Sequence, residues 1–469
     1  MIDQKIYEEL KGLIGEGKVS NNLADRLCFS RDVTPICYKW IDLYKLPPYI
    51  ADLVVSPENT RDIQSILKIA NNYKVKVYTY GGGSGVVGGV IPLEGGITVD
   101  MSRMDKVINL DSKSQTVEVE AGIIGQNLED YLNKNNYALR HFPQSLRSAS
   151  IGGMVATRST GQYSTKYGGI ENFVVGLEAV LPEGNIFKSS DKPRSSTGPD
   201  LNNIFIGSEG IFGIITKVIL KIFNIPENMK FQCFLYNDIY TALDNIRIVM
   251  QTGLRPAVVR LYNEKESYQK FSKLGFNYNG CLMILCYEGN SILTDAESKL
   301  SKEICQMNGG EYIGDELGKL WFENRFDTKH ILEKEEEFGG VSDAIELAAS
   351  WTKIKNLYNE TESYFKERNI TLASHFSHAY TNGISVYNLF FLNEPDEEIA
   401  IDTFYKIWND IMEIAIQNNA TISHHHGIGL IKNQMLKKEL GRGFEILKDL
   451  KKTMDPNYIM NSDKLINLR

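Results

Sequence analysis

The feature that most constrains this chain is a glycine-rich loop that directly follows a predicted strand. The strand ends at Tyr80, and residues 81–89 read Gly-Gly-Gly-Ser-Gly-Val-Val-Gly-Gly. The loop contains the Gly-x-Gly-x-x-Gly spacing of Rossmann dinucleotide-binding folds. That pattern requires a helix immediately after the loop, whereas a proline and a glycine pair between residues 92 and 96 disfavour one. We therefore interpret the loop as a nest of backbone N–H groups that cradles a diphosphate, with a plain glycine loop as the alternative.

Four further loops of small residues lie between predicted strands in the same part of the chain. Each offers backbone N–H groups and hydroxyls and keeps bulky side chains out of the way. Several such loops suit a long, flat, phosphate-bearing cofactor that lies between two subdomains. These loops span residues 142–145, 150–153, 157–161 and 207–210.

The composition is that of a globular protein and argues against several other classes. The chain has 469 residues, which at roughly 150 residues per domain suggests two to four domains. A hydrophobic fraction of 42% supplies packed cores and excludes disorder as the main state. A net charge of −8 argues against broad binding to phosphate backbones. We expect a small-molecule or lipid-phosphate substrate and no nucleic-acid partner.

Signals for membrane insertion or export are missing from the sequence. The most apolar segment, residues 210–223, is interrupted by Lys217 and Lys221, and so falls short of the roughly 18 apolar residues of a membrane span. The N-terminus has no apolar signal-peptide core. The six cysteines form no Cys-x-x-Cys pair and are typical of buried thiols in a reducing compartment. We expect a cytoplasmic homodimer without a transmembrane segment, and leave peripheral membrane contact open.

Hydrophobic periodicity divides the chain into four parts. Residues 1–45 form a partly helical lead-in, 46–225 a glycine-rich domain, 226–418 a middle α+β domain, and 419–469 a C-terminal return segment. The clearest unit is a strand at 52–55, a helix that starts at Ser56-Pro57, and a second strand at 74–80. The apolar face of this helix consists of Ile63, Ile66, Leu67 and Ala70. Further predicted strands span 96–101, 116–121, 174–181, 211–223, 281–287 and 384–392, and further predicted helices span 296–308, 356–368 and 433–454.

A series of motifs follows the glycine loop in a recognisable order. The first group comprises Val99–Met104, Val119–Gly122, Gly152-Gly153 and Gly207–Gly213, and this order resembles the FAD-binding domain of vanillyl-alcohol-oxidase-type (PCMH-type) flavoproteins. The second group comprises Pro193–Asp200, Arg255–Leu261, Tyr380–Tyr387, Ser423–Gly429 and Asp455–Met460. With these, the chain resembles the alkyldihydroxyacetonephosphate synthase family from about residue 46 onward. The resemblance implies an α+β fold: a PCMH-type FAD-binding domain of two subdomains, an α+β substrate (cap) domain, and a C-terminal segment that packs back near the flavin.

The resemblance also implies which residues hold FAD. Covalent attachment in related enzymes uses a histidine or cysteine, and because the glycine loop has neither we expect dissociable, non-covalent FAD. His141 falls where the synthases carry histidine, with a packing role or a role near the flavin. The implied cofactor-binding residues are Tyr80, Gly81, Gly82, Gly83, Ser84, Gly85, Val86, Pro143, Gln144, Ser145, Ser150, Gly153, Thr157, Arg158, Ser159, Gly161, Glu209, Gly210, Gly213, Ile214 and Ile215.

Five of the seven histidines lie in two clusters, His375 with His378 and the run His424-His425-His426. An extended segment would turn His425 away from its neighbours, so that the three could not share one metal ion. Related 2-hydroxy acid dehydrogenases bind a divalent metal with a His-x-Gly-Asp-Gly-Asn-x-His element and a Glu-His-Gly element. Here two of those ligands are changed, because Tyr387 falls near one and His425 replaces the glutamate. We therefore expect no metal, and a polar wall that binds anions and moves protons.

The resemblance assigns roles to residues that would otherwise be unremarkable. Tyr387, on a predicted strand, matches the catalytic acid/base tyrosine of the synthases, with His424, His425 and His426 assisting it. Arg325 and Arg260 match arginines involved in substrate binding and activity, and a guanidinium suits phosphate or carboxylate. Taken alone, Tyr387 would be a core tyrosine and Arg325 a surface charge. Two departures concern the pocket: Gln144 replaces an aspartate, and Ala344 a serine or threonine.

Three functions are consistent with these residues. The first is a synthase-like alkyl transferase of ether-lipid synthesis, in which a flavin N5 adduct lets a fatty alcohol replace the acyl chain of acyl-dihydroxyacetone phosphate. The alternative is an FAD-dependent oxidoreductase of a 2-hydroxy acid such as D-lactate or glycolate. A third interpretation, a non-catalytic flavin-binding subunit, is disfavoured because such a subunit need not keep Tyr387 and the histidines.

Overall fold

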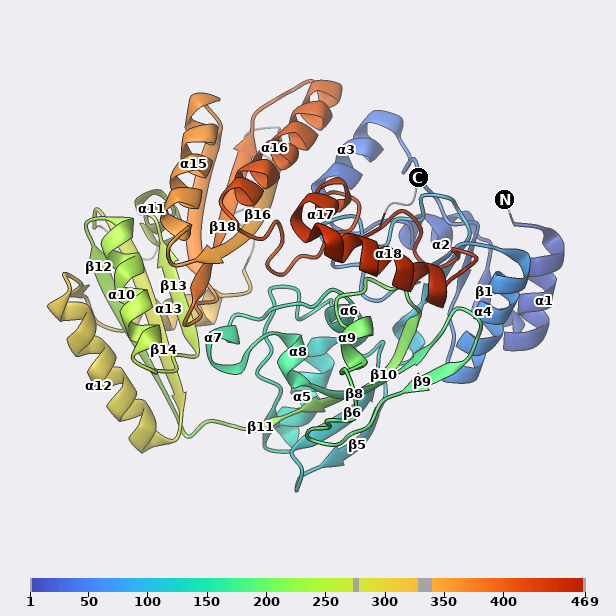
Figure 1. Cartoon of the computed structure of the whole chain (residues 1–469), viewed down its shortest axis with the longest axis horizontal. Coiled ribbons are helices and arrows are strands. Elements are labelled where there is room, and N and C mark those ends of the chain that lie inside the picture. Colours follow the sequence, from blue (N-terminus) through green and yellow to red (C-terminus); the bar gives the residue numbers. More distant parts are fainter. Residues whose placement is uncertain (1, 273–277, 328–339, 467–469) are drawn as a thin grey trace.

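The computed structural model describes residues 2–272, 278–327 and 340–466. It places two small sheets in one part of the molecule and a seven-stranded sheet in the other (Figure 1). The predicted mixed α+β organisation is confirmed. Among the described residues, no helix is both long and apolar enough to cross a membrane.

The first small sheet contains the unit that ends in the glycine loop. Its order is β1-β2-β4-β3, with β2 and β3 parallel to β4. Its strands are β1 (Val19–Ser20), β2 (Leu53–Val55), β3 (Val77–Tyr80) and β4 (Ile97–Asp100), and the helices around it are α1 (Gln4–Ile14), α2 (Leu23–Cys28), α3 (Pro35–Tyr44) and α4 (Thr60–Tyr73).

Helix α4 connects two of these strands and buries the predicted apolar face. Ile63, Ile66, Leu67 and Ala70 are all fully buried. The predicted start at Ser56-Pro57 is wrong, since the helix begins at Thr60. Asn59 caps it by accepting hydrogen bonds from the N–H groups of Arg61 and Asp62.

The second small sheet is antiparallel, in the order β5-β6-β10-β8-β9. Its strands are β5 (Val107–Asp111), β6 (Thr116–Glu120), β8 (Val174–Val180), β9 (Ile186–Lys188) and β10 (Ile214–Lys221); β7 (Tyr137–Ala138) pairs separately with β11 (Phe223–Asn224). The accompanying helices are α5 (Gly125–Lys134), α6 (Ile151–Ala156), α7 (Ser164–Tyr167), α8 (Ile170–Phe173) and α9 (Asn202–Phe205).

The seven-stranded antiparallel sheet, which we call the cap sheet, has the order β15-β12-β14-β13-β17-β18-β16. Its strands are β12 (Asn228–Tyr236), β13 (Val258–Tyr262), β14 (Cys281–Gly289), β15 (Glu311–Tyr312), β16 (Val341–Ser350), β17 (Thr371–Ser377) and β18 (Gly383–Leu392). Its helices are α10 (Ile239–Gln251), α11 (Glu264–Phe271), α12 (Ser291–Met307), α13 (Glu316–Asn324), α15 (Ile354–Glu367) and α16 (Glu397–Gln417).

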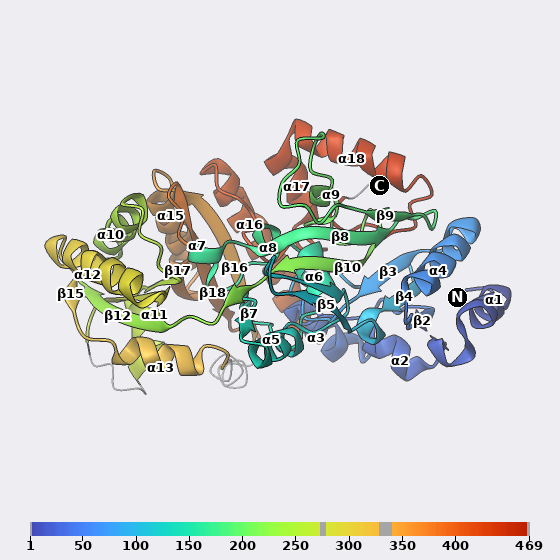
Figure 2. The same cartoon turned by 90° about the horizontal axis from the view of Figure 1, so that it is seen from below.

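The two faces of the cap sheet are covered by different helices. Gln232 on β12 bonds to Ser298 and Ser301 of α12, while its neighbour Phe231 packs against Phe322 of α13. Because successive strand residues point to opposite faces, α12 and α13 lie on opposite sides of the sheet. Figure 2 shows the same arrangement from below.

The C-terminal segment returns to the first small sheet. Its helices are α17 (Asn433–Leu440) and α18 (Arg442–Met454), so the single helix predicted over 433–454 is interrupted at Gly441. After α18 the chain pairs beside β3, where Val77 donates to the carbonyl of Ile459 over 2.7 Å and accepts from the N–H of Asn461 over 2.8 Å. This return carries the segment with three histidines to the glycine loop.

Candidate active site

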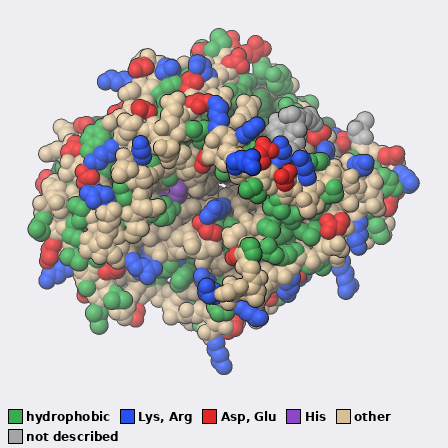
Figure 3. All heavy atoms as spheres, viewed as in Figure 1, with side chains coloured by type: hydrophobic (Ala, Val, Ile, Leu, Met, Phe, Trp, Pro, Cys, Tyr) green, Lys and Arg blue, Asp and Glu red, His purple; other side chains and the backbone are tan. Residues whose placement is uncertain are grey.

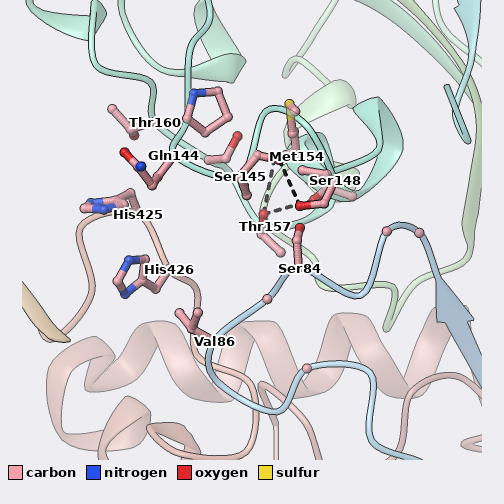
Figure 4. Close-up of a pocket in the computed structure, with 18 of the residues that line it drawn as sticks. Ser84, Val86, Gln144, Ser145, Ser148, Met154, Thr157, Thr160, His425 and His426 are labelled. Atoms are coloured by element: carbon pink, nitrogen blue, oxygen red, sulfur yellow. Dashed lines mark hydrogen bonds between the residues drawn. The ribbon is translucent and has the colours of Figure 1, made fainter. Parts of the chain in front are cut away.

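A cavity of about 620 Å³ lies where the glycine loops meet the cap sheet. The surface is hollowed between these two parts, and histidine atoms are visible near the hollow (Figure 3). Most of the predicted cofactor-binding residues line the cavity, on the glycine loop and on the segments 143–145, 150–159 and 209–215. In Figure 4, His425 and His426 stand across the cavity from Ser84, Ser148 and Thr157.

Three of the predicted cofactor-binding residues do not line the cavity. Tyr80 packs its ring edge-on against Phe29, with 5.0 Å between the ring centroids. The Arg158 side chain is 64% exposed and lies 3.6 Å from Glu171. A Cβ added to Gly161 would come within 2.5 Å of the backbone nitrogen of Phe142, so this glycine permits close packing.

The glycine loop is pressed against the backbone of a neighbouring loop. A Cβ on Gly82 would lie 1.7 Å from the Ser148 carbonyl oxygen, and one on Gly81 would lie 2.2 Å from the Ser150 hydroxyl. Glycine is required here by close approach, and the same closeness leaves backbone N–H groups facing the cavity. This arrangement fits a diphosphate-bearing cofactor.

The lead-in contributes to the cavity, which the sequence analysis did not predict. Asp32 and Val33 line it. The buried Asp32 carboxylate accepts from the N–H of Gly88 over 2.9 Å, and the N–H of Val33 donates to the carbonyl of Gly85 over 3.0 Å. Burial raises the pKa of Asp32. These contacts hold the glycine loop from the side opposite Ser148.

Glu209 connects the cofactor loops to the histidine segment. Its buried carboxylate accepts from the N–H groups of Ile428 (2.6 Å) and Gly429 (2.8 Å). Burial raises the pKa of Glu209, and these two N–H groups oppose that shift. The loop after the histidines is therefore fixed to the cavity wall.

The three consecutive histidines do not lie in an extended segment, so their side chains do not alternate in direction as expected. His424 and His425 turn toward each other, with 2.9 Å between their Nδ1 atoms, whereas His426 lies 3.4 Å from Glu346. His425 and His426 line the cavity, and His424 lies behind them in contact with the Tyr380 hydroxyl at 2.8 Å. The expectation that His424 and His426 share one face is therefore wrong.

Three imidazoles come together at this point: His378, His424 and His425. One nitrogen of each lies within 4.8 Å of the others, which is close enough to hold a metal ion. Burial lowers the pKa of His424 to about 4 and the pKa values of His378 and His425 well below the usual range. All three are thus neutral at pH 7, as a metal ligand or a proton acceptor must be.

Glu346 on β16 holds the histidine segment against the cap sheet. It is fully buried and accepts from Lys432 Nζ (2.8 Å), the Ser423 hydroxyl (2.8 Å) and the N–H of His426 (2.9 Å). Burial opposes ionisation, but Lys432 and His426 outweigh it and lower the pKa of Glu346. The carboxylate is therefore ionised and fully engaged.

Tyr387 lines the cavity from β18 with its ring beside three imidazoles. The His375 ring stacks on it with 4.9 Å between centroids, the His425 ring lies parallel to it at 6.1 Å, and His426 meets it edge-on at 5.7 Å. Burial raises the pKa of Tyr387, so its hydroxyl keeps its proton. The ring has one orientation, with its hydroxyl available as a proton donor.

Both predicted substrate-binding arginines line the cavity. Arg260 Nη1 lies 2.7 Å from His375 Nε2. The Arg325 guanidinium lies 3.9 Å from the Phe322 ring centroid and donates to the Phe322 carbonyl over 2.5 Å. Burial lowers the pKa of Arg325.

Several cap residues that line the cavity were not predicted as site residues. They include Glu266, Lys270, Trp321, His375 and His378. The histidines stood out as a cluster in the sequence, but only the fold gives them neighbours. The sequence signal for α11 is a pair of opposite charges four residues apart, Glu266 and Lys270, a spacing that favours a helix.

Comparisons with known proteins match both parts of the chain. The profile "FAD binding domain" matches residues 51–190, and "FAD linked oxidases, C-terminal domain" matches residues 225–465. The uncharacterized FAD-linked oxidoreductase YgcU of Escherichia coli K12 is 31% identical, with 97% of each chain covered. Alkyldihydroxyacetonephosphate synthase of Dictyostelium discoideum is 28% identical over 88% of this chain and 73% of its own length. Probable mitochondrial D-lactate dehydrogenase of Danio rerio is 27% identical over 99% and 92%.

A solved structure shares the fold. Alkyldihydroxyacetonephosphate synthase superposes with a TM-score of 0.82 at 24% identity, covering 98% of this chain and 85% of its own. The expected PCMH-type architecture is confirmed, since p-cresol methylhydroxylase superposes with a TM-score of 0.80 at 15% identity over 99% and 97%. The chain belongs to the FAD-linked oxidase family and is an enzyme with FAD as its cofactor.

Proposed function

We propose that this enzyme exchanges the acyl chain of acyl-dihydroxyacetone phosphate for a fatty alcohol, as the synthase family does. The observation that carries the proposal is Tyr387, which stacks with His375 and His425 and lines the same cavity as the glycine loops. The 28% identity to the Dictyostelium synthase supports it.

In this proposal the chain's own residues bind the substrate and move one proton. FAD, when bound, supplies a nucleophile that splits a difficult substitution into two easier steps. The ester C–O bond to the dihydroxyacetone carbon breaks, and the fatty acid leaves as its carboxylate. The alcohol oxygen bonds to that carbon and releases its proton to solvent, with no net redox change. Tyr387 exchanges the proton at the reacting carbon, with the histidine segment adjacent, and Arg325 and Arg260 hold the phosphate.

A second candidate is oxidation of a 2-hydroxy acid. It is favoured by the polar cap end of the cavity, where the described lining residues include Arg260, Glu266, Lys270 and Arg325. Such a lining suits a small anion better than a long acyl chain. The three imidazoles near Tyr387 also offer a metal site to such an enzyme.

An anaerobic visible spectrum of the FAD-loaded protein tests both candidates. Bleaching by palmitoyl-dihydroxyacetone phosphate, with fatty acid release and recovery on adding fatty alcohol, would support the transferase. Bleaching by D-lactate alone, with L-lactate as the control, would support the dehydrogenase. If neither compound bleaches the flavin, both candidates are contradicted.

A further inference from the structure

A chain of three hydrogen-bonded side chains lies at the cap end of the cavity. His375 Nδ1 is 2.9 Å from Glu266 Oε1, and His375 Nε2 is 2.7 Å from Arg260 Nη1. The three residues come from α11, β17 and β13, and all of them line the cavity. None of the roles assigned above to Tyr387 and the histidine segment requires this chain.

The chemistry of arginine fixes the direction of these hydrogen bonds. A guanidinium has donors only and keeps its charge, so His375 Nε2 must be the acceptor. The ring proton therefore sits on Nδ1 and is donated to the Glu266 carboxylate. Burial lowers the pKa of His375, in agreement with a neutral ring. Glu266 thus orients His375, and His375 orients Arg260.

Arg260 retains donor capacity after this contact. Its buried Nε has no hydrogen-bond partner within the described parts of the chain. The Trp321 ring, 5.7 Å from the guanidinium, restricts the side chain on one side. Leaving a buried donor unpaired costs about 1–3 kcal/mol.

A second cation lines the same end of the cavity. Lys270 lies one helical turn after Glu266 on α11, and its ammonium is 5.6 Å from the Tyr262 ring centroid. Burial lowers the pKa of Lys270, and the charges of Glu266, Arg260 and Asp327 all act on it. The cavity lining at this end includes three cations, Arg260, Lys270 and Arg325, and two carboxylates, Glu266 and Asp327, so the cations are in excess.

We propose that Arg260 and Lys270 form an oxyanion subsite, and that Glu266 and His375 are positioning residues that hold Arg260 in it. The ligand is a carboxylate or phosphate group. Because His375 stacks directly on Tyr387, the subsite lies a short distance from the tyrosine, so the anionic group belongs close to the reacting carbon. This inference rests on the proposed function in taking Tyr387 as the reacting end, and it deepens the role that the proposed function gives to Arg260.

Calorimetric titration of the FAD-loaded protein with inorganic phosphate and, separately, with oxalate tests the subsite. We expect Lys270→Met to weaken binding at least tenfold. Lys265→Met is the matched control, since Lys265 is exposed on the same helix and outside the cavity, and it should stay within twofold of the unmodified protein. If Lys270→Met weakens phosphate binding more than oxalate binding, the substrate group is a phosphate ester. If it weakens oxalate binding more, the substrate group is a carboxylate.

The positioning role has its own readout. His375→Ala should weaken anion binding at least tenfold, whereas His375→Gln should restore most of it because the amide oxygen can still accept from Arg260. With an active substrate, both effects should fall on KM more than on kcat. If Lys270→Met and His375→Ala keep FAD and bind both anions within twofold, or if neither anion binds the unmodified protein, the subsite is wrong. If the subsite holds while no substrate bleaches the flavin, the proposed function alone fails.

Discussion

Single side chains set the chemistry of this cavity through their immediate neighbours. Tyr387 would be an ordinary core tyrosine without the stacked rings of His375 and His425, which leave it one orientation. The neighbouring imidazoles are neutral because burial lowers their pKa values. A protonated tyrosine beside neutral imidazoles can give and take a proton without placing a net charge in the cavity.

Tyr387→Phe keeps the stacked ring and removes only the hydroxyl. We expect kcat to fall by about 10²–10⁴, the usual contribution of a general acid or base, with KM nearly unchanged. Steady-state kinetics on the substrate that bleaches the flavin measures this effect. Tyr364→Phe, on a cap helix away from the cavity, serves as the control. Unchanged turnover in Tyr387→Phe would remove the tyrosine from the mechanism.

His141 is a buried histidine that should make the stability of the protein depend on pH. Burial lowers its pKa from 6.5 to about 3, and it lies 2.9 Å from the Ser159 hydroxyl. Below pH 6.5 the unfolded chain binds a proton at this site that the folded chain excludes, so stability falls as pH drops from 6.5 toward 3. The slope reaches at most about 1.4 kcal/mol per pH unit for one such group.

His141→Gln should therefore have a flatter dependence of unfolding free energy on pH between 6.5 and 4. Urea unfolding at several pH values measures how the unfolding free energy changes with pH. A loss of stability that is the same at every pH leaves this slope unchanged. If the slopes of the two proteins are equal in this range, His141 is not excluded from protonation in the folded state.

At the scale of elements, local patterns predicted some of the helices and strands, and packing moved their ends. The strand predicted at 384–392 is β18 at Gly383–Leu392, and the helix at 356–368 is α15 at Ile354–Glu367. Gly441, with φ 53° and ψ −121°, divides the helix predicted over 433–454. A glycine within a helical pattern of apolar residues does not by itself predict this break, because its conformation depends on where α17 and α18 pack.

We expect FAD binding to depend most on the glycine loop. Gly82→Ala would place a Cβ 1.7 Å from the Ser148 carbonyl oxygen and force the two loops apart. We expect FAD affinity to fall at least tenfold, equivalent to about 1.4 kcal/mol. Titration of the FAD-free protein with FAD, followed by flavin fluorescence, measures it. Gly17→Ala has no heavy atom within 4 Å of the added Cβ and should bind FAD normally. If Gly82→Ala and the unmodified protein bind FAD with equal affinity, the two loops can move apart without loss of binding.

At the scale of the whole molecule, buried ion pairs connect parts that lie far apart in the sequence. Glu346 and Lys432 are both fully buried and join the cap sheet to the C-terminal segment. The pair Arg140–Glu288 similarly joins the segment after β7 to β14, with 3.4 Å between Nε and Oε1. Such pairs contribute little net stability but fix the relative positions of the parts they join.

Lys432→Met should destabilise the protein by about 3–5 kcal/mol, because it leaves the buried Glu346 carboxylate without its lysine counter-ion. The double variant Lys432→Met/Glu346→Leu should recover much of this loss, since it removes both charges. Thermal and urea unfolding of the FAD-free proteins measures the three free energies. A double variant no more stable than Lys432→Met would show that Glu346 acts mainly through its bonds to the histidine segment.

The sequence by itself determined the fold class and pointed to the glycine loops proposed to bind FAD and to the candidates Tyr387, Arg260 and Arg325. These follow from local signals: apolar periodicity, glycine spacing and short motifs. Only the tertiary structure decided which side chains meet. Glu266 and Arg260 reach His375 from 109 and 115 residues away, and His424 bends toward His425 instead of His426. Such contacts depend on sheet register and on the return of the C-terminal segment, which local sequence does not encode.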